Sequence, residues 1–203
     1  MNLIYCDDSL LAANKPAGLL AVPGRGADKQ DCLSARIQQE FPDALVVHRL
    51  DMATSGLIVF ARGAEMQRRL SQMFREREVE KRYVAVVQGR VAPTAGEIDL
   101  PLLVDWPNRP RQKVDHESGK PSLTRYSLLL HDTAGDTGRV ELEPVTGRTH
   151  QLRVHLAAIG HPILGDVLYG GRVAGRLLLH AQSLSFAHPL DGKPLHFVCE
   201  PPF

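Results

Sequence analysis

Strand-like segments outnumber helix-like segments along this chain of 203 residues, and the two kinds do not alternate regularly. A doubly wound sheet needs such alternation, because a helix joins each parallel strand to the next. The pattern therefore predicts an α+β fold with a mainly antiparallel mixed sheet and flanking helices. Strands are expected near residues 3–5, 10–13, 46–47, 57–61, 83–87, 98–104, 122–130, 140–142 and 177–197, with a break at 189–192. Helices are expected over 31–41 with Asp31 as cap, over 63–76, and over 150–159 with Gly160 as stop.

Size and composition fit one globular domain over residues 1–203. Hydrophobic residues make up 43% of the chain and charged residues 23%, which is enough to build a core. The N-terminus lacks the pattern of a signal peptide, and no apolar run is long enough to span a bilayer. The three cysteines, Cys6, Cys32 and Cys199, are odd in number and far apart. These features predict a cytoplasmic protein with reduced thiols and no membrane partner.

Asp51 occupies the most informative position in the chain. It precedes the turn-forming residues 54–56 and an apolar strand at 57–61, and it follows the strand expected at 46–47. Because Asp disfavours strands, Asp51 is expected on a loop that sheet holds at both ends. Such loops commonly carry functional groups. An Asp before a turn also often bonds only its own loop backbone, and that interpretation stays open.

Tyr83 and Arg153 are two further candidates. Tyr83 lies at the start of an expected strand, where a tyrosine either packs on the sheet or stacks on a nucleic-acid base. Arg153 lies beside the apolar stripe of the helix expected at 150–159. An arginine at a core edge needs an acidic partner or must reach water. An ordinary structural ion pair with any of the acids is therefore one interpretation of Arg153.

The segment 106–113 combines one tryptophan, two prolines and the cations Arg109, Arg111 and Lys113. Two prolines so close together argue against regular structure. The segment is either an ordinary surface loop or a finger that grips RNA phosphates. The net charge of only +1 is weak evidence against a nucleic-acid binder. Basic residues nevertheless gather at 62–82 and 109–125, with acids between them.

The sequence gives little indication of a metal or a nucleotide cofactor. The nine histidines show no ligand spacing with cysteines, and His150 and His155 would point from different faces of a helix. No glycine-rich loop precedes a helix in a phosphate-binding pattern. We therefore expect neither a metal nor a cofactor.

Four motifs resemble those of the RluA family of pseudouridine synthases, in the family's order and over essentially the whole chain. The segment around Asp51 resembles the family's His-Arg-Leu-Asp motif. The other three are Asn14-Lys15-Pro16, Lys81-Arg82-Tyr83 for Lys-x-Tyr, and Gly147-Arg148-Thr149-His150-Gln151-Leu152-Arg153 for Gly-Arg-x-His-Gln-Leu-Arg.

The resemblance implies the pseudouridine synthase catalytic fold and an isomerase that converts uridine in RNA to pseudouridine after base flipping. Asp51 would be the catalytic residue. Tyr83 would stack on the uracil, and Arg153 would pair with Asp51. Arg49 would fill the space of the flipped base, although a phosphate contact or a loop brace is an equal alternative. Lys15 would support the fold.

Residues 99–110 resemble a short branch of the family that modifies both 23S rRNA and a tRNA anticodon stem-loop. These RNAs are the expected partners of a monomer, without an N-terminal S4-type RNA-binding domain. Two alternatives stay open. One is an RNA-binding module in which Asp51 is only a brace. The other is an Asp-dependent glycosidic-bond hydrolase, although such enzymes normally need two carboxylates and the motif offers one clear acid.

Overall fold

The computed structural model describes residues 2–203 and divides into two compact units. Unit 1 comprises Met1–Lys81 and His180–Pro202, and unit 2 comprises Arg82–Leu179 with Phe203. Antiparallel strands dominate each unit, which confirms the predicted α+β class with a mixed sheet. No helix among residues 2–203 has both the length and the apolar character needed to cross a bilayer.

Unit 1 contains strands β1 (Leu3–Cys6), β2 (Leu10–Lys15), β3 (Ala44–Val46), β4 (Ser55–Arg62), β11 (Leu179–Ala187) and β12 (Pro194–Val198). The strand order is β1-β2-β4-β11, with β3 paired to β4 and β12 paired to β11. The pair of β4 with β11 is parallel, and the other pairs are antiparallel. Helices α1 (Leu33–Glu40) and α2 (Gly63–Glu76) follow β2 and β4, and a short 3₁₀ turn spans Ala27–Lys29.

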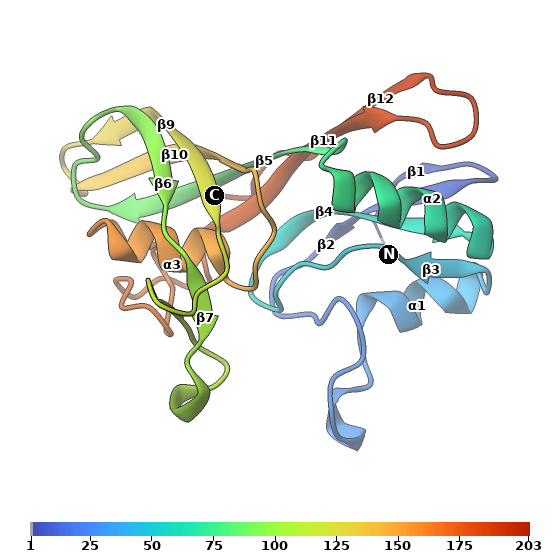
Figure 1. Cartoon of the computed structure of the whole chain (residues 1–203), viewed down its shortest axis with the longest axis horizontal. Helices are drawn as coiled ribbons and strands as arrows, with labels where there is room; N and C mark the ends of the chain where they lie inside the picture. The colour runs from blue at the N-terminus through green and yellow to red at the C-terminus, as the bar shows by residue number, and fades with distance from the viewer. Residues whose placement is uncertain (1) are drawn as a thin grey trace. The chain divides into compact units, whose positions relative to one another are not determined.

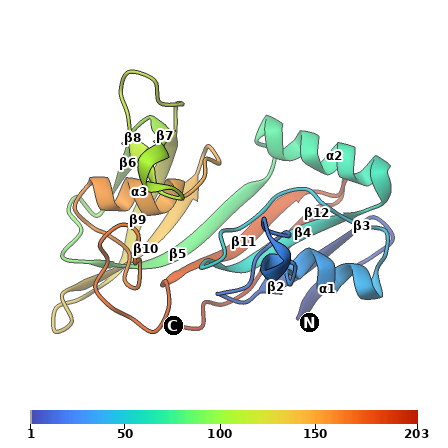
Figure 2. The ribbon, with the colours of Figure 1, turned by 90° about the horizontal axis from the view of Figure 1, so that it is seen from below.

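Strand β4 is buried on both faces, which explains its unbroken apolar sequence. Its alternate side chains enter two different cores. Leu57, Val59 and Ala61 pack with Met66 and Leu70 of α2, whereas Ile58 and Phe60 pack with Leu33 and Ile37 of α1. Figures 1 and 2 accordingly show α1 and α2 on opposite sides of these strands. The strand that leaves the Asp51 loop is therefore a rigid element.

Gly56 allows β4 to approach β11 closely. Its φ is +113°, and a Cβ atom there would lie 2.3 Å from the carbonyl oxygen of Ala181. Only glycine meets both conditions without strain.

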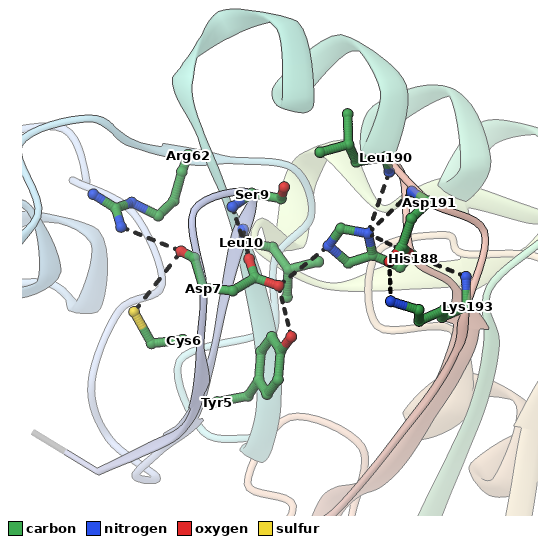
Figure 3. Close-up of polar contacts among 10 residues, drawn as sticks. All are labelled: Tyr5, Cys6, Asp7, Ser9, Leu10, Arg62, His188, Leu190, Asp191 and Lys193. Atoms are coloured by element: carbon green, nitrogen blue, oxygen red, sulfur yellow. Dashed lines mark hydrogen bonds and ion pairs between the residues drawn. The ribbon is translucent and has the colours of Figure 1, made fainter.

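A carboxylate ties the β1–β2 turn to the β11–β12 hairpin (Figure 3). Asp7 accepts a 2.6 Å hydrogen bond from the Tyr5 hydroxyl and pairs at 3.1 Å with His188 Nε2. The bond to the Asp7 carboxylate raises the pKa of Tyr5 to about 12. Burial alone would raise the pKa of Asp7, but hydrogen bonds from Tyr5 and two backbone amides outweigh it and lower that pKa.

Unit 2 contains strands β5 (Glu80–Gln88), β6 (Ala95–Asp99), β9 (Leu123–Asp132) and β10 (Thr137–Pro144) in the order β5-β10-β9-β6, all antiparallel. Its helix is α3 (Gln151–Ala158). A separate hairpin joins β7 (Leu102–Val104) to β8 (Gln112–Val114) through a 3₁₀ turn at Trp106–Asn108. Figures 1 and 2 show this hairpin extending from unit 2 beyond α3.

Two local predictions are wrong. Asp31 does not cap α1, because Cys32 is the N-cap residue and its Sγ accepts a hydrogen bond from the Ala35 amide, while Asp31 pairs with Arg36 at 2.7 Å. The segment 106–113 was also expected to lack regular structure throughout, but it contains the 3₁₀ turn at Trp106–Asn108 and its last two residues, Gln112 and Lys113, belong to β8. Its ladder uses residues 102–104 and 112–114, so Pro107 and Pro110 fall in the turn, where neither disrupts strand pairing.

Candidate functional site

Asp51 lies on the short loop between β3 and β4, as predicted. Asp51 is half-buried and follows the exposed Arg49 and the buried Leu50. The Thr54 amide donates a 3.1 Å hydrogen bond to the Asp51 carbonyl oxygen and closes the turn. The backbone is thus fixed where the carboxylate is attached.

Lys15 of β2 anchors this loop through hydrogen bonds, in the fold-supporting role expected of it. Its side chain is fully buried, and its Nζ donates to the carbonyl oxygens of Pro16 at 2.9 Å, Leu19 at 2.7 Å and Met52 at 3.1 Å. The amide of Gly18 also donates to the Met52 carbonyl at 2.8 Å. A buried ammonium requires several such acceptors. Met52 directly follows Asp51, so β2 and its turn hold the loop in place.

His48 holds the other end of the loop. Its Nε2 accepts a 2.9 Å hydrogen bond from the Val59 amide, beyond the point where β3 stops pairing with β4. The ring stacks on Phe74 of α2 with 4.3 Å between centroids. Burial, helped by the charge of Lys81, lowers the pKa of His48 to about 3. The imidazole is therefore neutral, and it must accept at Nε2.

The buried Ser55–His180 pair supports the loop rather than supplying a nucleophile. Ser55 Oγ lies 2.7 Å from His180 Nδ1, and His180 Nε2 lies 2.9 Å from the Cys199 carbonyl oxygen. A carbonyl can only accept, so Nε2 carries the proton and Ser55 donates to Nδ1. Both residues are at most 2% exposed. The pair fixes the start of β4 to β11.

Tyr83 lies on β5 of unit 2, opposite Leu142 of β10, and is half-buried. Its neighbour Arg82 pairs with Glu143 at 3.0 Å and with Glu141 at 3.6 Å. The cation between the two motif residues therefore stabilises the β5–β10 pair.

Arg153 of α3 forms a buried ion pair with Asp166, which the sequence analysis did not single out. Its Nε lies 2.7 Å from Oδ2 and its Nη2 lies 2.8 Å from Oδ1. Asp166 Oδ1 also accepts hydrogen bonds from the amides of Leu168 and Tyr169. This contact is the structural ion pair that the sequence left open as one interpretation of Arg153. The additional pairing with Asp51, a residue of unit 1, stays a prediction.

The remaining polar residues of this motif hold α3 against the strands. Gln151 Nε2 donates to Thr124 Oγ1 at 3.0 Å, which in turn bonds His155 Nδ1 at 2.9 Å. His155 Nε2 donates to the Leu100 carbonyl oxygen at 3.0 Å. Burial lowers the pKa of His155, so the ring is neutral. These residues are structural supports that the sequence analysis passed over.

The hairpin formed by β7, β8 and their turn, residues 102–114, exposes the three cations proposed to bind RNA. Arg109 stacks over the 64%-exposed Trp106 ring, with Cζ 3.8 Å from its centroid. Arg111 lies 5.7 Å from the ring of Tyr169, and Lys113 pairs with Asp115 at 2.9 Å. Aromatic rings contact the first two guanidiniums, and a cation–π contact leaves their positive charge in place.

Within residues 2–203, no three His, Cys, Asp or Glu side chains gather where they could hold a metal ion.

The candidate site residues are divided between the two units. Arg49 and Asp51 belong to unit 1, and Tyr83, Arg153 and the hairpin cations belong to unit 2.

Residues 9–158 match the model of a family described as RNA pseudouridylate synthase. The chain belongs to this family, whose members isomerise uridine in RNA to pseudouridine. Membership confirms the predicted enzyme class and favours it over the RNA-binding module and the hydrolase.

Individual relatives are similar to this chain over nearly its full length. The chain is 52% identical over 207 residues to the dual-specificity RNA pseudouridine synthase RluA of Yersinia pestis, with 100% of each covered. It is 51% identical over 199 residues to RluA of Escherichia coli strain K12, covering 96% of this chain and 90% of that one. The structure of human RNA pseudouridylate synthase domain containing 1 superposes with a TM-score of 0.81 at 30% identity, covering 100% and 84% of the two chains.

Proposed function

We propose that this pseudouridine synthase modifies two kinds of RNA, a site in 23S rRNA and a uridine in a tRNA anticodon stem-loop. The support is the full-length similarity to relatives named dual-specificity enzymes. The enzyme acts as a monomer, with its two units working as one catalytic domain. Its substrates place it in the cytoplasm.

Asp51 is the catalytic residue. The isomerisation breaks the bond from N1 to C1′ of the ribose and joins C5 to the same carbon. A proton leaves C5 while N1 gains one, so no oxidant or energy source is consumed. The uridine first leaves the base stack, because its reacting atoms are otherwise shielded. Asp51 then acts as a nucleophile or as a base, on the sugar or on the uracil.

The anchored loop carries this proposal. Lys15 and His48 fix the chain on both sides of Asp51, so the backbone that carries the carboxylate is held without help from substrate. A catalytic group gains from such preorganisation, since little reorganisation is needed during reaction.

The other candidates serve the same reaction. Tyr83 stacks on the uracil and takes the C5 proton. Arg153 orients the Asp51 carboxylate, while Asp166 holds Arg153. Arg49 fills the space that the flipped base leaves. A crystal structure in which Arg153 lies far from Asp51 would contradict the orienting role.

The substrate proposal is tested with two transcripts, a 23S rRNA fragment and a tRNA anticodon stem-loop. Purified protein is incubated with each, and pseudouridines are mapped. We expect a modified uridine in each RNA and none with Asp51→Asn. Modification of only one RNA would contradict dual specificity, and release of free uracil would contradict isomerisation.

A further inference from the structure

Tyr169 joins the hairpin of residues 102–114 to the start of α3. Its hydroxyl accepts a 2.8 Å hydrogen bond from the Gln112 amide, the first amide of β8. The same oxygen lies 2.7 Å from Nδ1 of His150, the N-cap residue of α3. One hydroxyl therefore connects two elements that are 57 and 19 residues away from it in the chain.

The backbone of Tyr169 belongs to the turn that holds Arg153. Its amide donates to Asp166 Oδ1 at 3.2 Å, the carboxylate oxygen that also binds Arg153 Nη2. The Tyr169 ring centroid lies 5.2 Å from Arg153 Cζ, within the range of a cation–π interaction. A displacement of Tyr169 would therefore also disturb the position of the Arg153 guanidinium.

The ring also contacts the hairpin. Arg111 Cζ lies 5.7 Å from the Tyr169 centroid. The same aromatic ring therefore lies beside one cation proposed to bind RNA and one cation proposed to orient the catalytic carboxylate.

We propose that Tyr169 is a positioning residue, which keeps RNA gripped by the hairpin in register with Arg153. This inference rests on the proposed function. The hydroxyl fixes the hairpin to the start of α3. The Tyr169 backbone amide binds Asp166, which in turn holds the Arg153 guanidinium. A misplacement of about 1 Å between bound substrate and catalytic groups can cost about a hundredfold in rate.

The test uses Tyr169→Phe, which keeps the ring and removes the hydroxyl. Tyr126→Phe on β9 is the matched control, since its hydroxyl makes no hydrogen bond within the described residues. Single-turnover rates are measured at saturating enzyme, and RNA affinity is measured separately. We expect Tyr169→Phe to lower the rate by about tenfold while Kd changes by less than about twofold. Tyr126→Phe should match wild type in both.

Repeating the Tyr169→Phe measurement in a second variant shows whether Tyr169 positions RNA or only supports the structure. In a variant with Arg109, Arg111 and Lys113 replaced by Ala, the hairpin no longer grips RNA, so Tyr169→Phe should cause no further loss of rate. A loss that persists there would show that Tyr169 acts on α3 alone and would overturn the proposal. An unchanged rate, or a loss confined to Kd, would overturn it as well.

Hydrogen exchange of the free proteins gives a readout that needs no substrate. Amides of β8, beginning with Gln112, should exchange faster in Tyr169→Phe than in wild type and Tyr126→Phe. Equal exchange would remove the basis of the inference. If wild type modified neither RNA, the proposed function would fail, whereas the exchange result would still decide whether Tyr169 holds the hairpin.

Discussion

At the scale of single residues, Lys15 shows how a buried charge can hold the Asp51 loop. Replacing it with Met should lower the free energy of unfolding by about 3 kcal/mol, because three carbonyl oxygens lose their donor. Urea unfolding measures this loss. Lys193→Met is the matched control, since the Lys193 side chain is 79% exposed and its ion pair with Asp191 contributes little. Equal stability of the two variants would show that the Lys15 bonds are not needed.

His48 should make stability depend on pH. In the unfolded chain its pKa is near 6.5, whereas in the folded protein it is about 3. Between these values the unfolded chain binds a proton that the folded protein does not. The free energy of unfolding should therefore fall as pH is lowered through this window.

The variant His48→Gln tests this dependence, because glutamine does not titrate but can still accept from the Val59 amide. Between pH 7 and pH 5, wild type should lose about 1–2 kcal/mol more stability than the variant. Denaturant unfolding at both pH values gives the difference. Parallel losses in the two proteins would show that other groups cause the acid sensitivity.

The catalytic roles of single residues could be predicted only from the family motifs. Residue type and the following turn placed Asp51 on a loop between strands, and the resemblance implied that Lys15 supports the fold; the structure agrees with both. Asp166 escaped notice, although an acid that follows the apolar residues 162–164 after a single glycine needs a partner if it is buried. The partner itself depends on tertiary contacts, which periodicity does not reveal.

At the scale of elements, the hairpin of residues 102–114 should grip RNA without supporting the core. Replacing Arg109, Arg111 and Lys113 with Ala should weaken RNA binding and flatten its salt dependence, because fewer counterions are released. Thermal stability should barely change, since all three side chains are exposed. Filter binding over a range of salt concentrations measures both effects.

The matched control for the hairpin replaces Arg68, Arg75 and Arg77, which are exposed on or next to α2, with Ala. This variant removes the same charge from the other unit. A larger loss of affinity in the control than in the hairpin variant would place the RNA grip on the 62–82 stretch instead.

Elements with strong periodicity were predictable from sequence, and weakly patterned ones were not. The amphipathic pattern of 63–76 gave the bounds of α2, and the apolar run at 57–61 gave the centre of β4. The hairpin turn was expected to continue as irregular chain through residue 113, but β8 begins at Gln112. Its prolines were visible, but the pairing of β7 with β8 that leaves them outside the ladder was not.

At the scale of the whole molecule, the order of motifs carried more information than composition. A net charge of +1 argued weakly against an RNA-binding protein, yet the chain belongs to a family that acts on RNA. Local concentration of cations, on the hairpin for example, matters more than the total. Coupling between residues as distant in sequence as Asp51 and Arg153 could be expected only through the resemblance.

The central claim is that this chain isomerises uridine in RNA through Asp51. The most direct measurement uses RNA that carries tritium at C5 of uridine, with wild type and Asp51→Asn compared under single-turnover conditions. Wild type should release tritium to water while the base stays in the RNA. Asp51→Asn should react at least about a thousandfold more slowly and bind RNA with a Kd within about twofold of wild type. A variant rate within about tenfold of wild type would contradict the account.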